Sequence, residues 1–226
     1  LQAKEQGIPV VTFDSDSARD TRLSYVGTDN YFFGVRLAKA LKQLHPLGGK
    51  YAIMSDRTPN ILQREAGVRD ELMQSKCSWI EVLQSPMNAN GDYEGSIEQM
   101  RTLATAIPDI TAIVPVFGAP MFLEDLWIGL ADEFRHVSFV VADDLPVQLA
   151  LLARGKAAGL VGQMPYEMGL RSIDSLYEVA AEGKTLPDFQ GTNVLEHIQI
   201  PLVLPPLQVD DNKLGGWVAI GYTLFG

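Results

Sequence analysis

Short apolar runs alternate with longer amphipathic segments along most of this chain. Apolar runs bounded by turn-forming residues predict buried strands, and apolar residues recurring at i, i+3 and i+4 predict helices. Strands are predicted at residues 8–13, 23–26, 51–54, 79–83, 111–117, 136–142, 160–163 and 192–200. Between them, helices are predicted at 61–75, 93–106, 145–153 and 166–181, with two more carrying Phe33, Leu37, Leu41 and Leu44, and Phe122, Leu126, Leu130 and Phe134. This alternation predicts an α/β fold with parallel sheets flanked by helices.

Polar residues follow several of these strands directly. Asp14, Ser15 and Asp16 come after the strand at 8–13, and the strand at 136–142 ends at Asp143 and Asp144. Ligands of open α/β sheets bind just outside the carboxyl ends of the strands, so Asp14 is a candidate for a ligand site. The alternative for Asp14 is a residue that only caps the next turn.

Two segments near the start carry a family resemblance. Residues 7–16, GIPVVTFDSD, and residues 25–34, YVGTDNYFFG, resemble segments of the type I periplasmic binding proteins, in their ribose- and sugar-binding branch. The resemblance covers residues 1 to about 200. It implies a two-lobe fold in which the first lobe is incomplete, because family members have upstream βα units that would make this chain N-terminally truncated. An incomplete first lobe would leave apolar edges uncovered.

The resemblance also implies where the chain crosses between the lobes. Crossings are expected near 25–30, 163–166 and 186–192. Residues 1–28 and 165–188 would form the partial N-terminal lobe, and residues 29–164 and 189–204 the C-terminal lobe. Residues 205–226 would form a separate tail.

By the same resemblance, a set of loop and helix-start positions would meet a ligand between the lobes. They are Asp14, Ser15, Arg64, Tyr93, Phe117, Asp144 and Gln163. Sugar hydroxyls both donate and accept hydrogen bonds, so carboxylates and a guanidinium side by side suit them. Aromatic side chains such as Tyr93 would stack on the C–H face of a sugar ring.

Each of these positions also has a structural alternative. Arg64 would otherwise be a solvated helix residue that pairs with Glu65 or Asp70. Tyr93 would otherwise pack at a helix start, and Asp143 with Asp144 would form a pair of helix caps. Of the two aspartates, Asp144 is the site candidate because the family pattern aligns with it.

Two departures from the family pattern bear on the ligand. Phe117-Gly118 stands where members usually have an Asn-Asp pair, and Ser15 stands where ribose-specific members have an arginine. The first replacement predicts a less polar wall on that side of the site. The ligand would then be less hydroxylated than a pentose or hexose, or would not be a sugar.

Composition excludes several other classes. The formal net charge is −10 and no Lys/Arg cluster is present, so a nucleic-acid partner is not expected. A single cysteine excludes an internal disulfide and a cysteine-rich metal site, and the three histidines share no ligand spacing. We therefore expect no metal and no cofactor. An enzyme using Asp14 and Asp144 as a carboxylate pair is the least favoured reading, since no nucleophile with an oriented base is evident.

The C-terminal residues allow two interpretations. Residues 214–226 are apolar and contain Trp217 and Tyr222, but a membrane-spanning helix needs about 20 residues. The run is either the beginning of a span with aromatic interface anchors or a terminal strand packed on a lobe. The first interpretation predicts a receptor anchored in the membrane.

The function expected from these features is non-catalytic binding of a small polar, sugar-like solute between two lobes that close by hinge motion. Such a protein works outside the cytoplasm, in the periplasm or extracellularly, either for ABC transport or as the sensor domain of a receptor. Its partner would be a transporter component or a membrane receptor. The alternative is the effector-binding core of a lactose-repressor-type regulator, which shares the fold.

Overall fold

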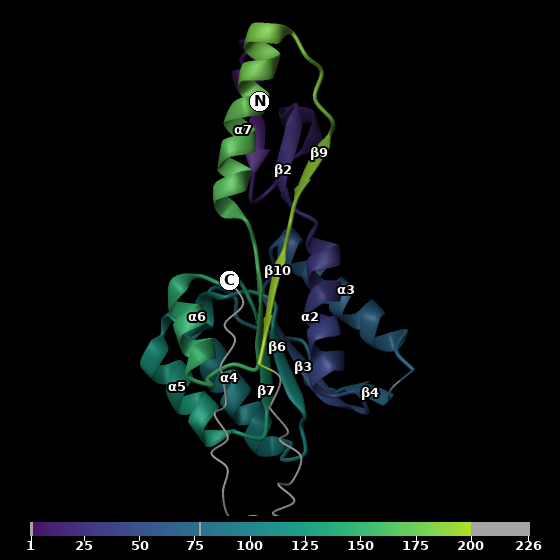
Figure 1. The fold of residues 1–226 in the computed structure, drawn as a ribbon, viewed down its shortest axis with the longest axis vertical. Coiled ribbons are helices and arrows are strands. Elements are labelled where there is room, and N and C mark those ends of the chain that lie inside the picture. The colour runs from purple at the N-terminus through teal and green to yellow at the C-terminus, as the bar shows by residue number, and fades with distance from the viewer. Residues whose placement is uncertain (1, 77, 200–226) are drawn as a thin grey trace, which may run out of the picture.

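The computed structural model describes residues 2–76 and 78–199, which form a small and a large lobe (Figure 1). The small lobe contains a three-stranded parallel sheet in the order β1-β2-β9. Its elements are α1 (Gln2–Glu5), β1 (Val11–Phe13), a 3-10 turn (Arg19–Thr21), β2 (Ser24–Thr28), α7 (Pro165–Glu182) and β9 (Phe189–Thr192). Segments from both ends of the described chain therefore build one lobe.

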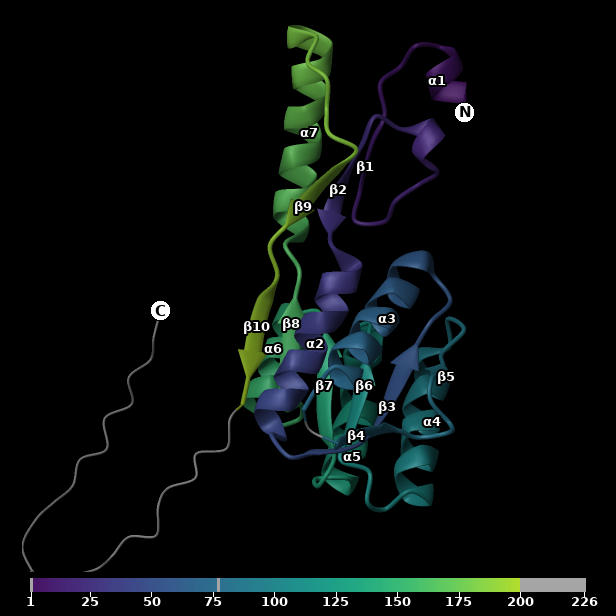
Figure 2. The ribbon, with the colours of Figure 1, turned by 90° about the vertical axis from the view of Figure 1, so that its right-hand side faces the viewer.

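Helix α7 lies along one face of this small sheet, against β1 and β2 (Figure 2). It begins with Pro165, whose fixed φ suits the first helical turn. It ends at Gly183, whose φ of +66° gives the left-handed cap that glycine adopts without strain. Large apolar side chains remain exposed on this lobe, among them Phe13, Ile173 and Tyr177. This exposure agrees with the expected incomplete first lobe.

The large lobe contains a seven-stranded sheet in the order β10-β8-β7-β6-β3-β4, with β5 also paired to β3. The pairs are parallel except β10 with β8, which is antiparallel. The strands are β3 (Gly48–Ser55), β4 (Ser78–Glu81), β5 (Met87–Asn88), β6 (Ala112–Pro115), β7 (Ser138–Ala142), β8 (Gly159–Gly162) and β10 (Leu195–Ile198). Central strands are buried on both faces, which is why they read as continuous apolar runs in the sequence.

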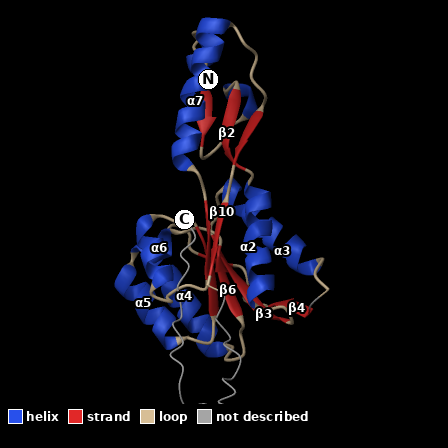
Figure 3. Cartoon of the chain, in the orientation of Figure 1, coloured by secondary structure: helices blue, strands red, loops and turns tan. Residues whose placement is uncertain are grey.

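Helices cover both faces of the large sheet, as Figure 3 shows. They are α2 (Asn30–Leu44) and α3 (Pro59–Met73) on one side, and α4 (Tyr93–Ala106), α5 (Glu124–Glu133) and α6 (Pro146–Ala153) on the other. A 3-10 turn at Ala119–Phe122 precedes α5. The core between sheet and helices includes the fully buried Phe33, Trp127 and Leu130.

Two sequence expectations about these elements are wrong in detail. The strand predicted at 192–200 corresponds to β10, Leu195–Ile198, which pairs with β8 in the large sheet. Apart from Thr192, β9 (Phe189–Thr192), which pairs with β2 in the small sheet, was not predicted. Residues 189–192 therefore lie in the small lobe, although we assigned them to the C-terminal lobe. In α5 the buried face holds Trp127 and Leu130, whereas Leu126 is exposed.

None of the helices described in residues 2–76 and 78–199 is long and apolar enough to cross a membrane. The tail at 205–226, with its two interpretations, lies outside the described residues.

Candidate functional site

The loops at the carboxyl ends of the strands meet between the two lobes. Asp14 follows β1 in a left-handed conformation, with φ +63°. Its backbone oxygen accepts a hydrogen bond of 2.8 Å from the Tyr25 hydroxyl, which fixes the turn. Burial, followed by the charges of Asp14 and Asp16, raises the pKa of Tyr25, so this phenol remains a donor at neutral pH. The Asp14 side chain is exposed at this turn.

Arg64 is the central charged residue on the large-lobe side. It is 3% exposed, and its Nε donates to Asn30 Oδ1 at 2.8 Å and one terminal nitrogen to the Val116 carbonyl at 3.2 Å. The guanidinium carbon lies 4.3 Å from the centre of the Phe33 ring, within cation–π range. The structure therefore does not place Arg64 as a solvated helix residue.

The environment of Arg64 combines low solvent access with nearby carboxylates. Burial lowers the pKa of Arg64, while the charges of Asp143 and Asp14 act in the opposite direction. Arginine stays protonated over the physiological range because its ordinary pKa is above 12. Arg64 is therefore a buried and permanently charged cation, and carboxylates from both lobes favour its charge.

A chain of hydrogen bonds joins the ends of three strands. Thr28, which ends β2, donates from Oγ1 to Gln163 Oε1 at 2.8 Å, and Gln163 Nε2 donates to Asp143 Oδ1 at 2.7 Å. The second oxygen of Asp143 accepts from the Gly118 backbone N–H at 3.2 Å. We call Thr28, Asn30, Arg64, Asp143 and Gln163 the polar cluster. Within this cluster, the Thr28–Gln163 hydrogen bond connects the first chain crossing between the lobes to the second.

The structure distinguishes the two neighbouring aspartates. Asp143 has a φ of +70° and faces Gln163 and Gly118. Asp144 instead lies 3.0 Å from His197 Nε2 of β10 and fills the space beside Gly162. Asp143 therefore belongs to the polar cluster, where we had expected Asp144.

The two aromatic candidates lie together. The rings of Tyr93 and Phe117 have centroids 6.0 Å apart, in a tilted arrangement. Phe117 is buried after β6, whereas Tyr93, the first residue of α4, is 43% exposed. Asp92 caps this helix by accepting from the Gly95 N–H at 2.8 Å, so the helix start and the tyrosine are held in place.

Ser15 lines a pocket of about 440 Å³ that we call the side pocket. Its lining from the small lobe also includes Asp16, Arg22, Tyr25, Asp188 and Phe189. Its lining from the large lobe includes Asn30 of α2, the cap residue Thr58, and Asn60 and Gln63 of α3. Thr28 and Asn30 belong to both the side pocket and the polar cluster. The two regions are therefore contiguous.

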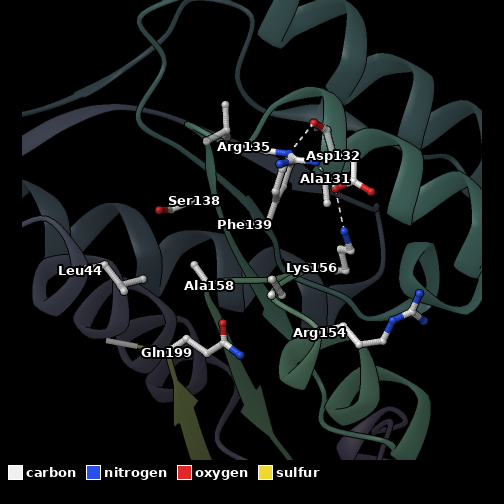
Figure 4. Close-up of a pocket in the computed structure, with 13 residues that line it drawn as sticks. Leu44, Ala131, Asp132, Arg135, Ser138, Phe139, Arg154, Lys156, Ala158 and Gln199 are labelled. Carbon is white, nitrogen blue, oxygen red and sulfur yellow. Dashed lines mark hydrogen bonds and ion pairs between the residues drawn. The ribbon is translucent and has the colours of Figure 1, made fainter. Parts of the chain in front are cut away.

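A second pocket, also of about 440 Å³, lies elsewhere in the large lobe (Figure 4). It is at the start of β7, where Ser138 lines it, whereas Asp143 follows the other end of that strand. Asp132 accepts from Arg135 at 3.2 Å and from Lys156 at 2.7 Å across it. It is therefore separate from the polar cluster.

Sequence reasoning missed Thr28, Asn30 and Asp143. The signal for Asn30 was available, since Thr28-Asp29-Asn30 joins a strand to a helix and Asp29 caps that helix by accepting from the Phe32 N–H. Asn30 is the first residue of that helix, and its buried side chain accepts from Arg64. Within residues 2–76 and 78–199, no group of three or more His, Cys, Asp or Glu side chains could hold a metal ion.

Two α/β lobes connected by several chain crossings, with polar side chains gathered between them, define a two-lobe ligand-binding protein. The family described as periplasmic binding protein domain matches residues 2–185, and this chain belongs to that family. No curated protein sequence matches closely enough to count as a relative.

Solved structures show the same architecture. GanP, a glucose-galactose binding protein from Geobacillus stearothermophilus, is 25% identical with a TM-score of 0.74, over 90% of this chain and 72% of its own. A solute binding protein of an ABC transporter from Burkholderia graminis, in complex with D-arabinose, is 24% identical with a TM-score of 0.75, over 88% and 69%. One from Agrobacterium vitis, bound with alpha-D-tagatopyranose, is 22% identical with a TM-score of 0.74, over 87% and 69%.

Proposed function

We propose that this protein binds a small neutral sugar between its lobes, without chemical conversion, and that the polar cluster and the Tyr93–Phe117 pair hold it. The observation that carries the proposal is the buried Arg64, hydrogen-bonded to Asn30, together with the hydrogen bond of the Gln163 amide to Asp143. Carboxylates accept from sugar hydroxyls, and guanidinium and amide N–H groups donate to them. Family membership supports a binding role outside the cytoplasm.

The proposed ligand contacts have two kinds of chemistry. Arg64, Asp143 and Gln163 supply charged and polar groups, which form the stronger hydrogen bonds to hydroxyls. Tyr93 and Phe117 supply an apolar surface, against which the C–H face of a sugar ring would pack. This combination favours a neutral ring with one apolar face. GanP and the two transporter proteins are described as sugar binders, which supports the same ligand class.

Binding would draw the lobes together. Asp14 and Ser15 are on the small lobe, whereas Arg64 and Asp143 are on the large one, so a ligand touching both sets bridges them. Closure of two lobes around a ligand by hinge motion is a well-known response of this geometry. The closed form would be presented to a membrane transporter or receptor.

A thermal-shift screen of the purified protein against pentoses, hexoses and polyols tests the proposal. A ligand at a hundred times its dissociation constant stabilises by about 2.7 kcal/mol. For a chain of this size that raises Tm by roughly 5–11 °C, at about 2–4 °C per kcal/mol. The variant that tests the site is Arg64→Lys, which keeps the charge but loses the planar guanidinium and its additional hydrogen-bond donors.

A shift with one sugar that Arg64→Lys reduces would support the proposal. If no sugar or polyol changes Tm, sugar binding is refuted. If a sugar shifts the wild type and Arg64→Lys equally, the ligand binds elsewhere and the polar cluster is not its site.

A further inference from the structure

The side pocket extends the polar cluster toward the start of α3, and the sugar proposed above uses Ser15 but none of the pocket's lining residues on α3. Its volume of about 440 Å³ is within the range of pockets that hold whole small molecules. Thr28 and Asn30 lie where the side pocket meets the polar cluster, since each lines the pocket and is hydrogen-bonded to another cluster residue. A ligand held by Arg64 and Gln163 would therefore have adjoining space on this side.

Unpaired polar side chains line this space. Ser15, Asn60 and Gln63 make no side-chain hydrogen bond to any other residue within 2–76 and 78–199. An amide offers both donors and an acceptor, and a hydroxyl offers one donor and two acceptor lone pairs. Asn60 and Gln63 also sit one turn apart on α3, so both reach the same side of the pocket. This lining matches hydroxyl groups.

The charged residues of the side pocket are already paired. Arg22, whose side chain is 2% exposed, donates to Asp16 at 2.6 Å and to Asp188 at 2.5 Å. Arg19 lies 3.3 Å from Asp188, and Asp29 is used as the cap of α2. Three aspartates and two arginines line the pocket, and the buried arginine is fully engaged. The charged lining is therefore net negative and its buried cation is engaged, which disfavours a phosphate or carboxylate and favours a neutral occupant.

An aromatic surface completes the pocket. Phe189 stacks on Tyr25 with ring centroids 5.5 Å apart and an interplanar angle of 29°, and 40% of Phe189 is exposed. A half-exposed ring beside free amides is suited to a ring that has one apolar face and hydroxyls at its edge. A pyranose or furanose unit has this character.

We propose that the side pocket is a second sugar subsite, so that the preferred ligand is a disaccharide or other glycoside. One ring would occupy the polar cluster and the next ring would occupy the side pocket. This inference rests on the proposed function, because the second ring is placed by the first. It adds Asn60 and Gln63 as specificity-determining residues that select ligand length.

Isothermal titration calorimetry on the purified protein tests the subsite, with D-glucose and D-galactose compared with cellobiose and lactose. We expect at least one disaccharide to bind about tenfold or more tightly than its own monosaccharides, as a few additional hydrogen bonds would give. The variant Asn60→Ala/Gln63→Ala should remove most of that gain. Gln74→Ala, at the far end of the same helix, is the matched control and should keep it.

The outcomes separate the two proposals. If monosaccharides bind but disaccharides bind no more tightly, or if the gain persists in the double variant, the subsite is refuted while sugar binding stands. If none of the four sugars binds the wild type or Gln74→Ala, the subsite is refuted, and the thermal-shift screen of pentoses, hexoses and polyols decides the sugar function separately.

Discussion

The close approach of α2 and α3 gives a sharp stability prediction. Gly34 of α2 faces Arg64 of α3, and a Cβ added at Gly34 would lie 1.9 Å from the Arg64 carbonyl oxygen. The reciprocal contact is at Gly67, whose added Cβ would lie 2.0 Å from the Tyr31 carbonyl oxygen. Both obstacles are backbone atoms, so neither can move without shifting a helix. The two glycines therefore set the distance between these helices.

The substitution Gly34→Ala has two opposing effects on the free energy of unfolding. Alanine is favoured over glycine in a helix interior by about 1 kcal/mol. Overpacking typically costs about 1–3 kcal/mol and occasionally more, and a contact of 1.9 Å to backbone belongs at the upper end. We expect a net loss of roughly 2 kcal/mol in the free energy of unfolding, or about 4–8 °C in Tm.

The matched control is Gly169→Ala, in the interior of α7. A Cβ at Gly169 would meet nothing within 4 Å, so only the helix-propensity gain applies. We expect Gly169→Ala to stabilise by about 0.5–1 kcal/mol. Urea denaturation followed by far-UV circular dichroism measures both variants. If Gly34→Ala is as stable as the wild type while Gly169→Ala behaves as expected, the close packing of α2 on α3 is refuted.

Three further predictions follow from other contacts. Burial raises the pKa of Glu81, but the hydrogen bonds that Glu81 accepts from Arg69 and Ser85 outweigh burial and lower that pKa overall. Ionised Glu81 therefore stabilises the fold above the unfolded pKa of about 4.3, and this stabilisation is lost as pH falls below that value. The urea midpoint of the wild type should therefore drop more between pH 6 and 3.5 than that of Glu81→Gln, and equal drops would contradict the assignment. Trp127→Phe should lower the free energy of unfolding by about 1–3 kcal/mol in urea denaturation, because the buried indole N–H donates to the Lys156 carbonyl at 2.8 Å. An unchanged free energy of unfolding would contradict that hydrogen bond. Asp143→Asn, in which asparagine tolerates the φ of +70°, should weaken sugar binding in calorimetry more than Asp144→Asn, and the reverse order would restore Asp144 to the site.

The alternation of strands and helices was predictable from sequence because most of the large-lobe strands are buried on both faces and bounded by breakers. The change from the small to the large sheet between Thr192 and Leu195 was not predictable, because the sequence pattern of an extended segment does not indicate which sheet it joins. The buried face of α5 was missed for a related reason. Leu126 and Trp127 are adjacent and both apolar, and only the position of neighbouring elements decides which one points inward.

The region proposed as the site was reached from the sequence, but the contacts within it were not. Arg64, expected there as a ligand contact, is buried, and its partners Asn30 and the Val116 carbonyl could not be predicted from residue spacing. The choice between Asp143 and Asp144 depends on one backbone angle, since a left-handed residue turns its side chain to the opposite side. Sequence alignment alone carries no information about that angle.

The hydrogen bonds of Gln163 connect ligand contact to lobe movement. Its oxygen is engaged by Thr28 on the first crossing and one N–H by Asp143 on the large lobe, which leaves its second N–H for a ligand. The third connecting segment is held differently: β10 pairs with β8, and His197 bonds Asp144. Because β9 belongs to the small sheet and β10 to the large one, the bend of that segment is confined between Thr192 and Leu195. Rotation of the lobes would therefore move Thr28 relative to Asp143 and strain the amide between them, so we expect ligand binding at Gln163 and lobe orientation to be thermodynamically coupled.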